Sequence, residues 1–156
     1  MNILLVYATN SGSTFEVAEL IEAELAKRHH VVLQKAVQTL PEDLHKYDLV
    51  ILGTPSWSVE GHEGYPAEPM LALLRGAMNT KFVHKKFALF GCGDSSYTYF
   101  CGAVDFLEKF VKDVRGNKVI HSLRIDGFYF DLNNARLQAG EWAKALRKVL
   151  DNYLGS

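Results

Sequence analysis

The sequence has little cysteine, no excess of charge of either sign and no long hydrophobic run. Its 156 residues include two cysteines, too few for a framework of disulfide bridges, which favours reduced thiols in a reducing compartment. The 17 basic and 18 acidic residues give a net charge of -1, so the composition offers no electrostatic basis for binding nucleic acid or an anionic membrane. No apolar segment approaches membrane-spanning length, and the first apolar strand starts too close to Met1 to leave room for a signal peptide. We therefore expect a cytoplasmic protein with a single domain over residues 1–156.

Several motifs of phosphate, nucleophile and metal chemistry are also absent. After the first apolar strand there is neither a Walker A sequence nor a Gly-x-Gly-x-x-Gly fingerprint, which disfavours a nucleoside triphosphate or a dinucleotide as ligand. Neither cysteine has the later arginine that a cysteine phosphatase needs, and the strand ends lack the aspartates of a phospho-receiver domain. The six histidines show no metal-ligand spacing. We expect no metal site and no catalytic residue.

The sequence does contain a regular alternation of strand and helix patterns. Strands are expected at 3–7, 31–37, 48–53, 87–91 and 118–125. Helices are expected at 13–28, 40–46, 67–75, 102–114 and 134–154. The alternation predicts an α/β fold, a three-layer α/β/α sandwich whose five-stranded parallel sheet has the order 2-1-3-4-5.

Two local details of the helices are also predicted. Ser13 and Glu16 have the spacing of a capping box at the start of the first long helix. The inward face of the last helix is expected to hold Leu137, Trp142, Leu146, Val149 and Leu150.

Three segments that follow strands carry the most unusual residues of the chain. The first, residues 9–14, has five hydrogen-bonding side chains and one glycine, with no lysine or arginine, directly before an amphipathic helix. This composition suits a single phosphate group held by hydroxyls, backbone N–H groups and a helix N-terminus. The expected loops 54–65 and 92–100 add Trp57 and Tyr97, two flat rings that suit a flat aromatic ligand between them. Each segment alone is also compatible with a polar helix cap or ordinary loop packing, but together they favour a phosphorylated aromatic ligand.

These segments resemble short-chain flavodoxins of the sulfate-reducer type, which are small electron carriers that bind FMN. The similarity covers essentially the whole chain and is carried by residues 6–16, 90–105 and 123–127 and by the pair Ser56-Trp57. The resemblance implies a low-potential one-electron carrier and not an enzyme. Its noncovalent FMN would shuttle between semiquinone and hydroquinone. The protein, a monomer, would exchange electrons with a reductase donor and an acceptor protein.

The resemblance also assigns roles within the cofactor site. It gives the phosphate to hydroxyls and backbone N–H groups of the first segment, the inner flavin face to Trp57 and the outer face to Tyr97. Ser56 would lie beside the ribityl chain, and backbone groups near Asp94, Tyr99 and Cys101 would bind the pyrimidine edge. The residues expected in the site are Thr9, Asn10, Ser11, Gly12, Ser13, Thr14, Pro55, Ser56, Trp57, Ser58, Cys92, Gly93, Asp94, Tyr97, Tyr99, Phe100 and Cys101.

Three features depart from the family pattern. Ser13 stands where asparagine is frequent, so one ribityl contact is missing or replaced by water. Ser58 stands where glycine often follows the tryptophan, at a peptide that turns its carbonyl toward flavin N5–H on one-electron reduction. Serine at positive φ costs more than glycine, so we expect a less stabilised semiquinone. The chain is nearly neutral, whereas flavodoxins are usually strongly acidic.

An alternative function is an FMN-dependent NAD(P)H/quinone oxidoreductase of related fold. Such enzymes usually need extra segments for a substrate pocket or a nicotinamide site. The longest irregular stretch expected here is the modest segment 54–65. A binding module that has lost its flavin is the other alternative.

Overall fold

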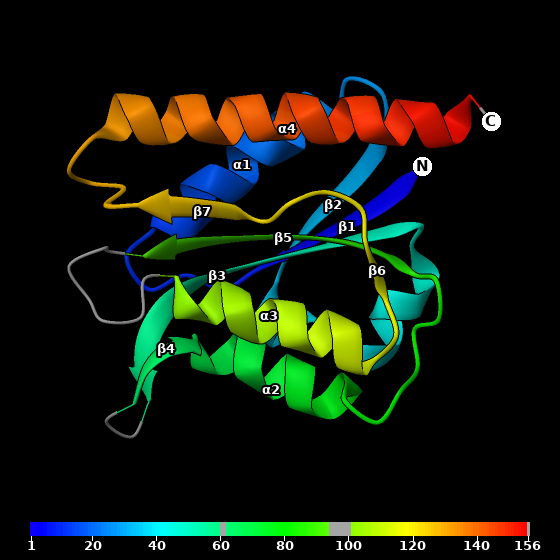
Figure 1. Cartoon of the computed structure of the whole chain (residues 1–156), viewed down its shortest axis with the longest axis horizontal. Coiled ribbons are helices and arrows are strands. Elements are labelled where there is room, and N and C mark those ends of the chain that lie inside the picture. Colours follow the sequence, from blue (N-terminus) through cyan, green and yellow to red (C-terminus); the bar gives the residue numbers. More distant parts are fainter. Residues whose placement is uncertain (60–61, 94–100, 156) are drawn as a thin grey trace.

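A computed structural model describes residues 1–59, 62–93 and 101–155 as a three-layer α/β/α sandwich (Figure 1). The helices α1 (Ser13–Leu25) and α4 (Leu132–Leu154) cover one face of the central sheet. The helices α2 (Glu68–Ala77) and α3 (Gly102–Asp113) cover the other face. Among the described residues, none of the helices combines the length and apolar character needed to cross a bilayer.

The predicted fold class is confirmed, and the first four predicted strands have the expected order 2-1-3-4. The described sheet nevertheless has seven strands, one of which (residues 62–66) is antiparallel, so the prediction of a five-stranded parallel sheet is wrong in strand number and direction. Strands β1 (Asn2–Tyr7), β2 (His30–Lys35), β3 (Leu49–Val59) and β5 (Lys86–Gly93) run parallel in the order β2-β1-β3-β5. Strands β6 (Asn117–Lys118) and β7 (Leu123–Asp126) both pair with β5 on its far side. The prediction of one continuous fifth strand is therefore wrong. Between β6 and β7 the carbonyl of His121 accepts a hydrogen bond from Trp142 Nε1 of α4 at 2.8 Å and is not used in the sheet.

The prediction of a loop over 54–65 is also wrong. Strand β3 continues to Val59, and the chain returns antiparallel as β4 (His62–Pro66) (Figure 1). Thr54 and Pro55 still pair with Gly91 and Cys92 of β5, so the sheet itself extends β3 beyond the point where its apolar run ends.

The sheet explains why three strands read as continuous apolar runs. Successive residues of β1 point to opposite faces, so Ile3 packs toward α1 and α4 while Leu4 packs toward α2 and α3. Strand β5 shows the same alternation, with Phe90 on the first face and Phe87 on the second. Because both faces are covered by helices, both sets of side chains are buried, and the strands have no polar side.

Two short 3₁₀ helices, Ala36–Gln38 and Pro41–Lys46, follow β2, and the second lies where a short helix was expected. Helix α1 ends at Leu25, earlier than predicted. In α4 the predicted inward face is correct for Trp142, Leu146 and Leu150, whereas Val149 is half-buried. Leu137 is 61% exposed, so its prediction as a core residue is wrong. The small side chains of Ala135 and Ala139 face the core in its place, which lets α4 pack closely on α1.

Candidate functional site

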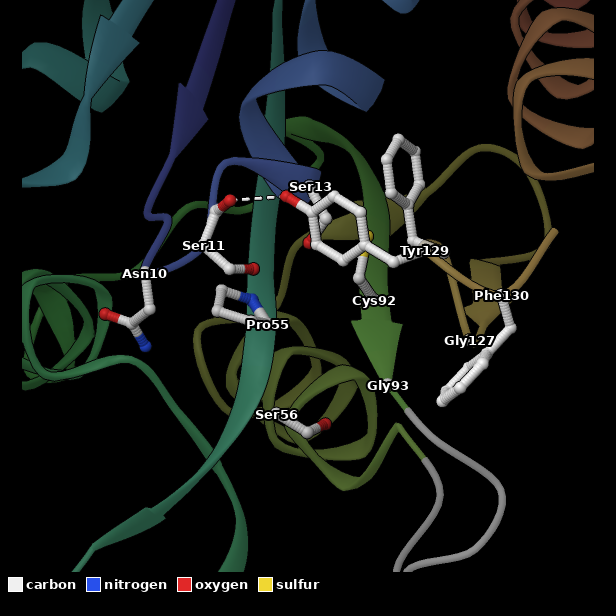
Figure 2. Close-up of a pocket in the computed structure, with 11 residues that line it drawn as sticks. Asn10, Ser11, Ser13, Pro55, Ser56, Cys92, Gly93, Gly127, Tyr129 and Phe130 are labelled. Atoms are coloured by element: carbon white, nitrogen blue, oxygen red, sulfur yellow. Dashed lines mark hydrogen bonds between the residues drawn. The ribbon is translucent and has the colours of Figure 1, made fainter. Parts of the chain in front are cut away.

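The carboxyl ends of β1, β3 and β5 converge on a cavity at one edge of the sheet (Figure 2). A fourth segment, which follows β7, closes the cavity on the side of α4. The lining residues are Asn10, Ser11, Ser13, Pro55, Ser56, Cys92, Gly93, Gly127, Phe128, Tyr129 and Phe130. The first three sequence segments are therefore brought together as predicted. No lysine or arginine is among the described residues that line the cavity.

The turn between β1 and α1 presents backbone N–H groups to this cavity. Gly12 is the N-cap of α1 with a φ of 94°, a left-handed conformation that glycine adopts without steric cost. Its carbonyl accepts the first helical hydrogen bond, from Glu16 N at 3.0 Å. The N–H groups of Ser13, Thr14 and Phe15 therefore have no acceptor within the helix. Together with the helix dipole they form a site suited to an anion.

The predicted capping box at this turn is wrong. Ser13 is the first helical residue and not the cap, and no side chain caps α1. The Glu16 carboxylate instead lies 3.3 Å from Nε of Arg136 on α4. Because the box is absent, the N–H groups of the first turn are not occupied by a side chain of the helix.

Thr14 gives an independent indication of a ligand at this turn. Its residue is fully buried, and its Oγ1 has no hydrogen-bond partner among the described residues by geometric criteria, with only the weakly accepting thiol of Cys92 beside it. A buried hydroxyl left without a partner costs about 1–3 kcal/mol. A phosphate oxygen at the helix N-terminus would supply the missing acceptor. The residues present therefore fit a phosphate group held without a side-chain cation.

The other predicted phosphate hydroxyls occupy different positions. Thr9 Oγ1 accepts a hydrogen bond from Gly12 N at 2.9 Å, so its own proton remains to be donated. Asn10 and Ser11 lie on the rim of the cavity (Figure 2). Thr9 thus shapes the turn as well as being a candidate ligand.

Two buried cysteines lie beneath the site. Burial raises the pKa of Cys92 to about 11, although the hydroxyls of Ser13 and Thr14 would hydrogen-bond its thiolate and oppose this shift. Burial also raises the pKa of Cys101, to about 12. Cys101 begins α3 in a left-handed conformation with a φ of 48°, and its Sγ faces the carbonyl oxygens of Gly91 and Ile125. Both thiols are neutral near pH 7 and are not nucleophiles, and Cys92 gives the cavity an uncharged floor.

The extended hairpin β3–β4 is tied to the helices on either side. Ser56 Oγ accepts a hydrogen bond from Ala103 N of α3 at 3.2 Å, and Thr54 Oγ1 accepts one from Ala67 N at 3.0 Å. The pairing shifts by one residue between Trp57 and Val59, so that Ser58 alone lies opposite Glu63 and Gly64. Gly64, the second of these two residues, has a φ of 80°, a left-handed conformation that glycine adopts without steric cost. The backbone of Ser58 therefore lies at an irregular point of the ladder.

The flavin-ring contacts predicted from the sequence fall largely outside the described residues. Asp94, Tyr97, Tyr99 and Phe100 lie outside them, as do the side chains of Trp57 and Ser58. The stacking and pyrimidine-edge assignments stay predictions.

Sequence reasoning missed the segment that follows β7. Gly127 has a φ of 54°, and its N–H donates to the carbonyl of Gly93 at 2.8 Å. The Phe130 N–H donates back to the carbonyl of Gly127 at 2.8 Å, which closes a turn. The hydroxyl of Tyr129 donates to the carbonyl oxygen of Ser11 (Figure 2). A glycine followed by three aromatic residues directly after a strand was the available signal.

Comparison with known proteins agrees with this geometry. The family model described as Flavodoxin matches residues 5–135. A flavodoxin of Nitratidesulfovibrio vulgaris (strain Miyazaki F) is 36% identical over 144 residues, which are 91% of this chain and 94% of that protein. The crystal structure of oxidised Flavodoxin 2 from Bacillus cereus has a TM-score of 0.80 and 32% identity, and the match covers 95% and 99% of the two chains. The flavodoxin of Fusobacterium nucleatum, solved with flavin mononucleotide bound, shares the fold with a TM-score of 0.79 at 21% identity, over 94% and 97% of the chains.

Proposed function

This chain belongs to the flavodoxin family, and from that premise we propose that the cavity at the ends of β1, β3 and β5 holds FMN noncovalently through the residues described above. The protein is an FMN-dependent electron carrier and not an enzyme. When bound, FMN supplies reversible transfer of single electrons at low potential. The observation that carries the proposed placement is that the cavity is lined by the start of α1, whose first-turn N–H groups have no helical acceptor and whose Thr14 hydroxyl is buried without a partner by geometric criteria.

The turn at residues 9–14 would bind the phosphate by hydrogen bonds alone. The N–H groups at the start of α1 and the hydroxyls of Thr9 and Thr14 donate, and the helix dipole adds a favourable field. No side-chain cation among the described lining residues neutralises the negative charge. A site that retains this charge opposes the arrival of further negative charge nearby, which lowers the reduction potential.

The floor and hairpin would set the environment of the ring. The neutral thiol of Cys92 and the ring of Pro55 exclude water from the inner wall. The carbonyl at Ser58 is the atom that we assign to accept a hydrogen bond from a proton held at flavin N5. Its position opposite a bulge gives that peptide fewer ladder bonds to break when it turns.

We further propose that Trp57 and Tyr97 stack on the two faces of the ring, and that backbone near Asp94, Tyr99, Phe100 and Cys101 binds its edge. The family pattern and the position of both segments at the ends of β3 and β5 support this assignment. Flavodoxins exchange electrons with redox partner proteins. We propose that this protein does so as a monomer with one domain, in the cytoplasm.

An anaerobic reductive titration of the purified chain, followed in the visible spectrum, tests the proposed function. We expect a yellow protein with FMN in near one-to-one amount, which passes through a blue stage before it bleaches. Bleaching without a blue stage would contradict one-electron transfer even if FMN is bound. Steady oxidation of NAD(P)H with a quinone would favour the enzymatic alternative. A colourless protein that does not take up added FMN would contradict the cofactor assignment.

A further inference from the structure

Building on the proposed function, we propose that Tyr129 is a positioning residue that latches the phosphate-binding turn in its binding-competent form. The structure joins the Tyr129 hydroxyl to the carbonyl oxygen of Ser11, across 118 residues of sequence (Figure 2). Ser11 belongs to the turn that would hold the phosphate. The latch thus links this turn to a part of the chain that sequence reasoning did not place in the site.

The peptide between Ser11 and Gly12 is held at both ends. Its carbonyl oxygen accepts from Tyr129, and its N–H donates to Thr9 Oγ1 at 2.9 Å. Two bonds on opposite sides of a planar peptide fix the direction in which that plane faces. The next residue, Gly12, has a φ of 94° and would otherwise explore a wide range of conformations. Fixing this peptide therefore holds in place the end of the turn that leads into the first N–H groups of α1.

Tyr129 is 57% exposed, and its backbone belongs to a hydrogen-bonded turn. Gly127 is bonded to Gly93 at the end of β5, and the Phe128 ring is buried and packs edge-on against the Tyr129 ring at 5.1 Å. Two residues after Tyr129, the carboxylate of Asp131 caps α4 by accepting from Asn134 N at 3.1 Å. Strand and helix thus fix the backbone on both sides of Tyr129. Its hydroxyl lies so near the turn that a Cβ added to Gly12 would be 3.5 Å away.

A latch of this kind acts before the ligand arrives. Ordering a flexible turn during binding costs conformational entropy and so weakens the affinity. A turn that is already ordered before the ligand arrives does not carry this cost. The hydroxyl of Tyr129 bonds to the phosphate-binding turn, and to no other part of the site among the described residues. Its loss should therefore weaken binding of a phosphorylated flavin more than binding of the same ring without phosphate.

The test compares FMN with riboflavin on the full chain after removal and reloading of flavin. In Tyr129→Phe the ring and its packing on Phe128 remain, and only the hydroxyl is lost. We expect the Kd for FMN to rise about five- to tenfold, which corresponds to the loss of one hydrogen bond. We expect the Kd for riboflavin to change by less than about twofold. Quenching of flavin fluorescence gives both constants. Tyr153→Phe, at the far end of α4, is the matched control and should leave both constants unchanged.

Amide hydrogen exchange of the flavin-free chain gives a second measurement. We expect faster exchange at Gly12 in Tyr129→Phe than in the wild type, because its bond to Thr9 opens more often. Equal loss of FMN and riboflavin affinity, or unchanged FMN affinity and exchange, would overturn the latch. Failure of the wild type to bind FMN would overturn the proposed function instead, while the exchange experiment would still decide whether the latch exists.

Discussion

In the proposed site a single hydroxyl, that of Thr14, would have opposite effects on the flavin-free and the flavin-bound protein. In the flavin-free chain it is buried without a hydrogen-bond partner, which destabilises the fold. With the proposed phosphate at the first turn of α1 it would become a donor to an anion, one of the stronger hydrogen bonds that proteins make. A group that costs stability when empty and contributes affinity when filled is characteristic of a binding residue.

Thr14→Val separates these two effects. We expect the free energy of unfolding of the flavin-free chain to stay the same or rise by up to about 1 kcal/mol, because an unsatisfied buried polar atom is removed. We expect the Kd for FMN to rise at least about tenfold, because a hydrogen bond to a charged group is lost. Urea unfolding and fluorescence titration measure the two quantities. Thr14→Ser, which keeps the hydroxyl, should bind FMN close to the wild type, and unchanged FMN affinity in Thr14→Val would remove the residue from the site.

At this scale the sequence predicts chemistry better than contacts. Residues 9–14 could be proposed as a phosphate-binding turn because hydroxyls, a glycine and a helix start lie within six positions. Tyr129 could not be identified in the same way, because its contact with Ser11 spans 118 residues and depends on how β7 and α4 pack. The residue types of a short segment indicate which chemical group it suits, whereas a contact between distant segments is determined only by the tertiary fold.

At the scale of elements, the hairpin β3–β4 shows where sequence patterns mislead. A loop was expected over 54–65, and Pro55, Ser56 and Gly64 in that segment are residue types common in turns. Pairing of Thr54 and Pro55 with β5 overrides that tendency, and the left-handed Gly64 lies within the bulge instead of a turn. The break between β6 and β7 has a similar origin, since a tertiary bond from Trp142 takes the carbonyl of His121. In both cases tertiary hydrogen bonds decide the backbone, and sequence patterns do not record them.

Ser58→Gly tests the role of this hairpin. If the peptide at residue 58 must reach positive φ to turn its carbonyl toward a protonated flavin N5, glycine removes a penalty of about 1 kcal/mol. We expect the potential of the first electron to rise by up to about 40 mV, the same free energy expressed for one electron. Spectroelectrochemistry of the FMN-loaded protein measures the potential. A lower potential, or less of the blue stage, would contradict a turning peptide at this position.

At the scale of the whole molecule, the sheet order could be predicted with few assumptions. The apolar runs of β1, β3 and β5 required helices on both faces, and helices of suitable length lie between the strands. Right-handed crossovers then leave few ways to arrange such strands. The core positions followed from the same alternation, with Leu137 as an exception on the long helix α4.

His29 joins distant parts of the chain in this fold. Its side chain is fully buried where α1, α4 and the N-terminus meet, with Nδ1 at 3.2 Å from the Met1 ammonium and Nε2 at 3.8 Å from Asp151. Burial lowers the pKa of His29, and the Met1 ammonium adds to this effect, as do Arg28 and Arg147 more weakly. The Asp151 carboxylate opposes it without reversing it. His29 therefore resists protonation in the folded state.

The lowered pKa of His29 predicts a stability that falls in mild acid. Between the unfolded-state pKa of about 6.5 and the lower folded-state pKa, the unfolded chain binds a proton that the folded chain does not, so the free energy of unfolding decreases as the pH falls through this range. In His29→Gln this proton is absent from both states. We expect the stability lost between about pH 7.5 and pH 5.5 to be smaller in His29→Gln than in the wild type. Urea unfolding of the flavin-free chain with a free Met1 amino group at the two pH values measures the difference. The neighbouring exposed His30, changed to Gln, should leave the wild-type dependence intact, and parallel pH dependences of wild type and His29→Gln would show that His29 is not the group responsible.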